Sequence, residues 1–349
     1  MSEAEDELTN VEIIQQVAQF AAPAGKTHGM HWEGVHFEDG VVYAQNEYGG
    51  MLAMLDGLDL NCSVSATLLQ KVLKALPSNP KFKVSKTEMT VSSGSQATAK
   101  LPLMLSGEPS FHRPDPQLKW SVTDSLCDVQ RAAWACSTDV TRPTFQALHL
   151  GAKGIESTNG SVAVRIDCGN FHEMLGRDVL VMARELKGIG VGPRYLAADD
   201  RRLYVSLNEA GTRYRSLKLI EGQFPDIEQL FPAHVPSITA TKDELQAAIK
   251  RARVSAKAAI LRVSGGALSF KTDLTSEQSL FEYSDSVEVR EVEKGFNLDP
   301  IGIDLDYLQA AVQHACEGGE ISLRMDDPLR ALQVVAPGYL ALVMPRRVA

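Results

Sequence analysis

The stretch IDLDYLQAAVQHAC, residues 303–316, carries apolar residues at the spacing of one face of a helix. Two short runs rich in β-forming residues follow it, EISLRMD (320–326) and ALQVVAP (331–337). Runs of this length and composition are typical of strands. The sequence here predicts a helix followed by two strands.

The same order of elements occurs twice more along the chain. VSATLLQKVLKAL (64–76) precedes KFKVSK (81–86) and EMTVSSG (88–94), and DVLVMARELKGIG (178–190) precedes RYLAADD (194–200) and RLYVSLNE (202–209). The interval is about 115 to 125 residues, which is a common size for one domain. The chain is therefore predicted to hold three copies of one unit.

A second helix is predicted at the start of each copy, in NVEIIQQVAQFAA (10–22), SLCDVQRAAWACS (125–137) and TKDELQAAIKRARVSA (241–256). In the last of these, Thr241 and Glu244 have the spacing of a capping box. Proline-rich stretches at 107–120 and 224–237 resemble linkers between compact units. We predict an α+β fold of three repeated domains, 1–117, 118–233 and 234–349, each with two helices packed on antiparallel sheet.

Basic residues gather on the predicted helices, although the formal net charge of the chain is -9. Four positive charges and no acid share one face of the 241–256 helix, and smaller clusters fall on the other helices. Net charge does not say where charges lie, so an acidic chain can still present a basic surface to phosphates. The candidate DNA-facing residues are Lys71, Lys74, Arg177, Arg184, Lys187, Lys242, Lys250, Arg253 and Lys257.

Other classes of protein are disfavoured by composition. No apolar run has the roughly 20 residues of a membrane span, and the acidic start lacks the order of a signal peptide. The five cysteines are scattered and never form Cys-x-x-Cys, which argues against disulfides and zinc. We expect a cytoplasmic protein that needs no metal or cofactor and does not bind a membrane.

An enzyme is the first alternative considered. GIGVGP (188–193) has the glycines of a phosphate loop, but Pro193 and strand-like residues follow where such a loop must open a helix. No serine lies in a Gly-x-Ser-x-Gly elbow, and no cysteine has a histidine nearby in a recognisable active-site segment. We expect no catalytic residues.

Five segments resemble the bacterial sliding clamp, the β subunit of the replicative DNA polymerase, and they occur in that family's order. EGQFPDIEQLFP (221–232) is similar to its Gly-x-Phe-Pro-Asp stretch, and STDVTRPTFQALHL (137–150) to its Ser-Thr-Asp-x-x-Arg-Pro stretch. ESTNGSVAV (156–164) stands where the family has Thr-Asp-Gly-His-Arg. IGIDLDYLQAAV (301–312) resembles its Tyr-Leu helix start, and YLALVMPRRV (339–348) resembles its Met-Pro-Met-Arg ending.

The resemblance implies a head-to-tail homodimer whose six similar domains form a ring around duplex DNA. It also implies a hydrophobic pocket that captures short peptides from the replicative polymerase, the clamp loader and other clamp-motif proteins. The positions carried over to this pocket are Phe145, Thr158, Gly160, Val162, Ala163, Pro225, Gln229, Leu230, Asp304, Tyr307, Val343, Met344, Pro345 and Arg346.

The chain departs from the family's pattern at several pocket positions. Ser161, Val162 and Ala163 replace His, Arg and an aliphatic residue, Gln229 replaces an Arg, and Arg346 replaces a Met. The resemblance therefore implies a changed peptide preference. A second alternative stays open: a protein-interaction module with the clamp fold that does not encircle DNA. EQSLFEY (277–283) also resembles a clamp-binding peptide, although a strand is the favoured interpretation.

Overall fold

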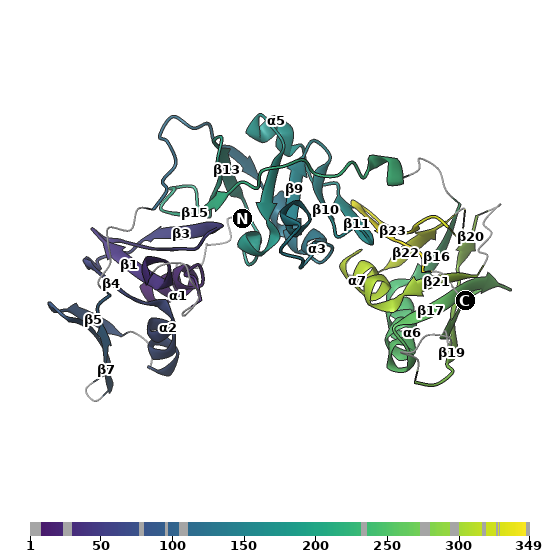
Figure 1. The fold of residues 1–349 in the computed structure, drawn as a ribbon, viewed down its shortest axis with the longest axis horizontal. Helices are drawn as coiled ribbons and strands as arrows, with labels where there is room; N and C mark the ends of the chain where they lie inside the picture. Colours follow the sequence, from purple (N-terminus) through teal and green to yellow (C-terminus); the bar gives the residue numbers. More distant parts are fainter. Residues whose placement is uncertain are drawn as a thin grey trace, which may run out of the picture. The chain divides into compact units, whose positions relative to one another are not determined.

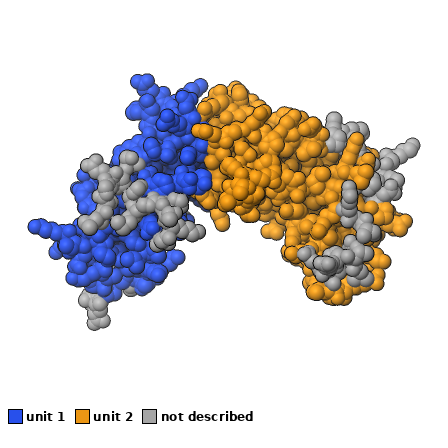
Figure 2. All heavy atoms as spheres, in the orientation of Figure 1, with its two compact units in different colours: residues 1–126, 188–219 blue, residues 127–187, 220–349 orange. Residues whose placement is uncertain are grey.

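The structure is a computed structural model that describes residues 8–23, 30–76, 80–94, 97–104, 111–231, 236–272, 280–293, 300–315, 319–325, 327 and 329–346. The chain forms two compact units (Figure 2). Unit 1 comprises residues 1–126 and 188–219, and unit 2 comprises residues 127–187 and 220–349. No helix within the described ranges is long and apolar enough to cross a membrane.

Unit 1 is built on an eight-stranded antiparallel sheet (Figure 1). Its strand order is β4-β1-β2-β3-β15-β14-β13-β8, so strands from the start of the chain pair with strands from around residue 200. The strands are β1 (Gly34–Glu38), β2 (Val41–Gln45), β3 (Gly49–Met54), β4 (Cys62–Ser65), β8 (Ser121–Thr123), β13 (Arg194–Ala198), β14 (Arg202–Ser206) and β15 (Arg213–Lys218).

Two helices lie side by side against this sheet, α1 (Asn10–Ala18) and α2 (Ala66–Ala75) (Figure 1). Thr9 and Glu12 form a reciprocal capping box that fixes the start of α1, and the α1 residues Ile14 and Val17 are fully buried. A three-stranded sheet follows α2, made of β5 (Lys81–Val84), β6 (Glu88–Ser93) and β7 (Ala97–Pro102) in that order. A short 3-10 turn, η1 (Met30–Glu33), precedes β1.

Unit 2 is built on a nine-stranded sheet in the order β12-β9-β10-β11-β24-β23-β22-β16-β20. Its strands are β9 (Ala147–Gly151), β10 (Gly154–Thr158), β11 (Val162–Ile166), β12 (Val179–Met182), β16 (Ser237–Thr241), β20 (Glu291–Val292), β22 (Glu320–Arg324), β23 (Leu332–Ala336) and β24 (Tyr339–Val343). A four-stranded sheet, β19-β18-β17-β21, contains β17 (Ala258–Ser264), β18 (Ala267–Thr272), β19 (Ser284–Glu288) and β21 (Ile301–Asp304).

The long helices of unit 2, α6 (Lys242–Ser255) and α7 (Leu305–Ala315), pack against each other (Figure 1). The shorter helices are α3 (Val129–Ala133), α4 (Pro143–Gln146) and α5 (Phe171–Leu175), with 3-10 turns η3 (Ala183–Leu186) and η4 (Glu228–Leu230). The 3-10 turn η2 (Ser125–Asp128) leads into α3.

The two large sheets repeat one plan. In each, the last strand of a four-stranded group pairs antiparallel with the last strand of another hairpin. In unit 1 this pair is β3 with β15, and in unit 2 it is β11 with β24. The order of strands in the four-stranded sheet, β21-β17-β18-β19, repeats that of β4-β1-β2-β3 and β12-β9-β10-β11. The structure thus agrees with an internal repeat, while the predicted boundaries near residues 117 and 233 stay a prediction.

The two faces of the nine-stranded sheet can be assigned from side-chain contacts. Ser157 on β10 donates a hydrogen bond to the carbonyl of Ala132 in α3, and Tyr339 on β24 donates one to the carbonyl of Ala311 in α7. Because side chains alternate along a strand, Ala163 and Leu342 point to the opposite face. There they pack with Ile227 of the 221–231 segment, called here the linker. The helices cover one face, and the linker lies on the other, outer face.

Several sequence expectations about helices are wrong. Residues 178–190 form β12 and the 3-10 turn η3 instead of a helix. Buried apolar runs such as Val179–Met182 fit a strand as well as a helix, and Gly188 and Gly190 adopt positive φ just beyond η3. Within 125–137, only α3 is α-helical.

The predicted capping box at Thr241 is also absent, because Thr241 ends β16 and its Oγ1 is buried without a hydrogen-bond partner in the structure. Of the segment 277–283, residues 277–279 lie outside the described residues. Residues 280–283 precede β19 and are not part of it, and both Leu280 and Phe281 are exposed.

Candidate functional site

The predicted partner-site residues come together in unit 2, where β11 and β24 pair. Met344, the first residue after β24, donates its backbone N–H to the carbonyl of Ser161 at 2.9 Å. The end of the chain is thereby tied to the turn between β10 and β11. Four separate segments meet at this place: 142–146, 158–163, 302–307 and 342–346.

The turn between β10 and β11 is closed by Thr158. Its Oγ1 donates to the carbonyl of Val162 at 2.6 Å and accepts from the N–H of Gly160 at 3.1 Å. Gly160 has φ of 93°, a conformation that favours glycine. A Cβ at Gly160 would lie 3.8 Å from the ring of Phe145, and the Arg142 guanidinium stacks over that ring at 3.7 Å. Thus Phe145, Gly160 and a cation share one corner of the site.

The start of α7 forms a second corner. The Oδ1 of Asp304 accepts hydrogen bonds from the backbone N–H groups of Asp306 (3.0 Å) and Tyr307 (3.3 Å), which caps the helix. The backbone N–H of Arg346 donates to the carbonyl of Gly302 at 2.7 Å, and its guanidinium lies 3.4 Å from Asp304 Oδ2. Arg346 is therefore held against the end of β21, next to the start of α7, and its side chain stays half exposed.

The linker supplies the remaining wall. Ile227 is buried on Ala163 and Leu342, and Phe224 and Phe231 pack against the same cluster. Leu230 follows within η4 with 44% of its surface exposed, and Met344 is 40% exposed. Leu230 and Met344 are thus large exposed apolar side chains beside a buried apolar cluster. An apolar residue of a partner could pack on such a surface.

Two of the predicted pocket residues point the wrong way. Val162 and Val343 pair with each other and lie on the helix side, almost fully buried. Leu342, for which the sequence analysis makes no prediction, is the residue of this pair of neighbours that lies on the outer face. The period-two alternation along YLALV could have shown this, because an inward Tyr339 requires an outward Leu342. Ala163 lies on the outer face, beside Leu342 and Ile227.

The candidate DNA-facing residues divide into two groups. Lys71 and Lys74 are exposed on α2, and Lys250 and Arg253 are exposed on α6. Lys257 is exposed just beyond α6. Lys242 is instead 7% exposed, and its Nζ donates to the carbonyl of Gln313 in α7 at 2.9 Å. That amine is engaged in packing α6 on α7, so the expectation for Lys242 is wrong.

The cluster predicted on the 178–190 helix does not exist as one helix face, because that helix is absent. Arg177 lies half-buried in the turn before β12, Arg184 lies on η3, and Lys187 is exposed after it. Within the described ranges, no group of three His, Cys, Asp or Glu side chains is placed to hold a metal ion.

Solved structures share this fold. The DNA polymerase III β subunit of Thermotoga maritima matches with a TM-score of 0.82 at 19% identity, over 97% of both chains. The DNA polymerase sliding clamps of Bacillus subtilis (TM-score 0.81, 15% identity) and Caulobacter crescentus (0.79, 17%) also match over 97% of both chains. No protein-family model matches the chain, and no curated protein matches it by sequence. The chain has the three-domain α+β clamp fold, as predicted.

Proposed function

We propose that this chain is a divergent DNA sliding clamp that encircles duplex DNA as a homodimer and tethers a replicative polymerase and other partners through a peptide-binding site. The observation that carries the proposal is the match to solved sliding clamps over 97% of the chain. The fold alone does not specify a function. The proposal therefore also rests on edges, charges and exposed residues of this chain.

The dimer is supported by the internal repeat. β3 pairs with β15 and β11 pairs with β24, yet the equivalent strand of the four-stranded sheet, β19, has no described strand on its outer side. β7 is likewise an edge in the described part of unit 1. Unpaired strand edges invite pairing with another chain. If β19 of one copy pairs with β7 of a second copy, this pair repeats the pairing of β3 with β15 and of β11 with β24. The same pairing between β7 of the first copy and β19 of the second closes a ring.

Charge and apolar surface support the same pairing. Lys81, Lys83 and Lys86 are exposed on and beside β5, in the sheet that contains β7. Near β19, Glu288 and Glu291 are exposed and acidic. Val254 and Leu280, which are 66% and 79% exposed, lie close together because the N–H of Leu280 donates to the carbonyl of Ser255. Complementary charge around an apolar contact favours a specific partner orientation.

Binding to duplex DNA is supported by exposed lysines and arginines on helices. Lys71 and Lys74 are exposed on α2, the second helix of the first copy, and Lys250 and Arg253 are exposed on α6, the first helix of the third copy. Contacts to phosphate carry no sequence information and need not be tight in a closed ring. Enclosure would then retain the protein on DNA despite its net charge of -9.

The partner site is proposed at Phe145, Thr158, Gly160, Ala163, Pro225, Leu230, Leu342 and Met344, with Arg142 and Arg346 as flanking cations. Methionine suits surfaces that accept varied apolar side chains. A peptide with an aliphatic or aromatic pair fits the exposed Leu230 and Met344. We place the chain in the cytoplasm as a non-catalytic accessory subunit that uses no cofactor, and expect a clamp loader to open it.

The alternative is a clamp-fold interaction module that does not encircle DNA. One observation keeps it open: where the first and third domains carry α2 and α7, the second has only the four-residue turn η3. The second domain therefore offers less basic helix surface to DNA than the repeat predicts.

A topological assay separates the two functions. The chain is incubated with nicked circular DNA and a clamp loader, isolated on the DNA, and the DNA is then cut once. A clamp stays on the circle and is released after linearisation, because free ends let the ring slide off. Retention on linear DNA, or no retention on the circle, would exclude encirclement.

A further inference from the structure

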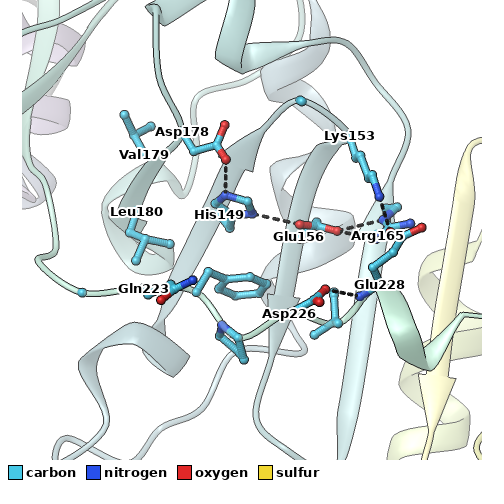
Figure 3. Close-up of a pocket in the computed structure, with 15 residues that line it drawn as sticks. His149, Lys153, Glu156, Arg165, Asp178, Val179, Leu180, Gln223, Asp226 and Glu228 are labelled. Carbon is cyan, nitrogen blue, oxygen red and sulfur yellow. Dashed lines mark hydrogen bonds and ion pairs between the residues drawn. The ribbon is translucent and has the colours of Figure 1, made fainter.

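A cavity of about 370 Å³ lies on the outer face of unit 2, between β9 to β12 and the linker (Figure 3). It adjoins the proposed partner site at Pro225. Its lining is rich in charged side chains, among them His149, Glu156, Arg165 and Glu228. These four residues, called here the His149 network, have no part in the function proposed above.

His149 lies between two carboxylates (Figure 3). Its Nδ1 is 2.8 Å from Glu156 Oε2, and its Nε2 is 3.3 Å from Asp178 Oδ2. Asp178 also contacts Nδ1 of His172 at 2.8 Å. Carboxylates only accept, so each contact is a hydrogen bond when the facing ring nitrogen carries a hydrogen.

The network continues from the sheet to the linker. Arg165 Nε donates to Glu156 Oε1 at 2.8 Å, and Arg165 Nη2 donates to Glu228 Oε2 at 2.6 Å. Lys153 pairs with the same Glu228 carboxylate. Glu156 is 7% exposed. Burial raises the pKa of its carboxyl, but hydrogen bonds from His149 and Arg165 more than offset this, and the pKa lies below its usual value.

Aromatic contacts hold the linker at the same residues. Phe224 stacks on the His149 ring with centroids 4.9 Å apart and planes 16° apart, and Phe231 lies 4.6 Å from the Arg165 guanidinium. Between them, Ile227 is buried on Ala163 and Leu342. Three linker side chains, Phe224, Ile227 and Phe231, therefore attach the linker to the sheet.

The linker backbone contributes little to this attachment. Ile220 donates to the carbonyl of Leu180, and η4 has internal hydrogen bonds. Within the described part of the chain, no backbone hydrogen bond joins residues 221–226 to the strands. The position of the linker on the sheet therefore depends on side chains, namely those of the His149 network together with Phe224 and Phe231.

The equivalent place in unit 1 has a tyrosine where unit 2 has Glu156. There His36 pairs with Tyr43 across β1 and β2, as His149 pairs with Glu156 across β9 and β10. Tyr43, Leu52 and Tyr214 form an apolar cluster, and Phe111, from the proline-rich stretch 107–120, packs on it. An apolar cluster is sufficient to hold a linker.

We propose that the His149 network positions the linker, and through it Pro225 and Leu230, for peptide binding. The inference rests on the proposed function of that site. His149, Glu156 and Arg165 are positioning residues: they act through the linker and do not contact the peptide. Shifting the linker would move one wall of the site while leaving Met344 and Phe145 in place.

The test uses the full chain and a synthetic Gln-x-x-Leu-Phe peptide, with hydrogen exchange of residues 221–231 as a second measurement. Phe224→Ala should speed linker exchange and weaken the peptide roughly tenfold, and Phe224→Tyr should restore both by keeping the stack. His149→Ala added to Phe224→Ala should cause little further loss, because both act through one contact. Phe111→Ala is the matched control in unit 1 and should leave peptide affinity unchanged.

The outcomes separate the two claims. If the peptide does not bind the wild-type chain, the proposed function fails, and this inference fails with it. If the wild-type chain binds and Phe224→Ala speeds exchange without changing affinity, only the positioning role is overturned. Equal weakening by Phe111→Ala would also overturn it, since the effect would then be a general loss of stability.

Discussion

Leu342 of β24 lies directly opposite Ala163 of β11, and Ile227 of the linker covers both side chains on the outer face. This contact joins a strand of the second repeat, a strand of the third and the segment that connects them. The exposed Leu230 and Met344 stand at its edge. The proposed partner site is therefore a consequence of how consecutive repeats share one sheet.

The apolar wall of the partner site gives the first prediction. Leu230→Asp should weaken binding of a Gln-x-x-Leu-Phe peptide at least about tenfold, because it places a charge where an apolar side chain is desolvated. Fluorescence anisotropy of a labelled peptide measures this. Val292→Asp is the control, since Val292 is 50% exposed on β20, which β23, β22 and β16 separate from β24 in the same sheet. Equal affinities for the two variants would contradict the assignment.

Arg346 gives the second prediction. Its guanidinium is half exposed and only 3.4 Å from Asp304 Oδ2, so it can also reach an acid of the bound peptide. A peptide with an acidic residue after its apolar pair should bind wild-type chain about two- to fivefold tighter than Arg346→Met, since exposed ion pairs contribute up to about 1 kcal/mol. A peptide with glutamine there should bind both equally. A loss shared by both peptides would mean that Arg346 acts structurally.

The third prediction concerns the basic residues of α6 and α2. Charge reversal at Lys71, Lys74 and Lys250 should flatten the salt dependence of DNA binding, by a slope of about 0.9 for each phosphate that is no longer neutralised. Lys242→Met should leave that slope unchanged and lower the free energy of unfolding by about 1–3 kcal/mol, because Lys242 bonds the Gln313 carbonyl. Titrations from low to moderate salt decide it. A flattened slope in Lys242→Met would contradict the structural role.

Acid stability gives the fourth prediction. The pKa of Glu156 is lowered in the folded chain, so its ionised contacts stabilise the fold above the usual glutamate pKa of about 4.5. That contribution is lost as the pH falls through the lower folded pKa. Urea unfolding between pH 7 and pH 3 should show a smaller acid-induced loss for Glu156→Gln than for wild type. Parallel curves would show that Glu156 titrates normally.

The sequence predicted the repeat because the first and third copies carry periodic helices followed by strands, and the second copy carries the same strands. It identified α1, α2, α6 and α7. It failed at 178–190, where a buried strand of valines and a 3-10 turn imitate the apolar spacing of a helix. Strand and helix spacing cannot be separated over so short a run.

The sequence is limited in a similar way at the candidate site. The order of the segments predicts a site around Ala163, Pro225 and Met344, and this location stays a prediction. The alternation of side chains along β24 decides which of them points outward, and the outward residue is Leu342, not Val343. Lys242 shows the same limit on a helix: the period locates a face but does not say whether a neighbouring helix covers it. The His149 network could not be foreseen, since its members lie on separate strands and the linker.

The central claim is that β7 and β19 of two copies pair head to tail and close a ring. We align the β6–β7 hairpin on β23–β24, and the β18–β19 hairpin on β10–β11. The pairing of β24 with β11 then places Thr98 of β7 opposite Ser286 of β19, and both side chains are exposed. The measurement is oxidative crosslinking of Thr98→Cys, Ser286→Cys and the double variant, resolved on a non-reducing gel. We predict a covalent dimer, twice the chain mass of 38.0 kDa, from the double variant or from a mixture of the two single variants. Each single variant alone should stay uncrosslinked. A covalent dimer from one single variant alone, or none from the double variant, would contradict the head-to-tail ring.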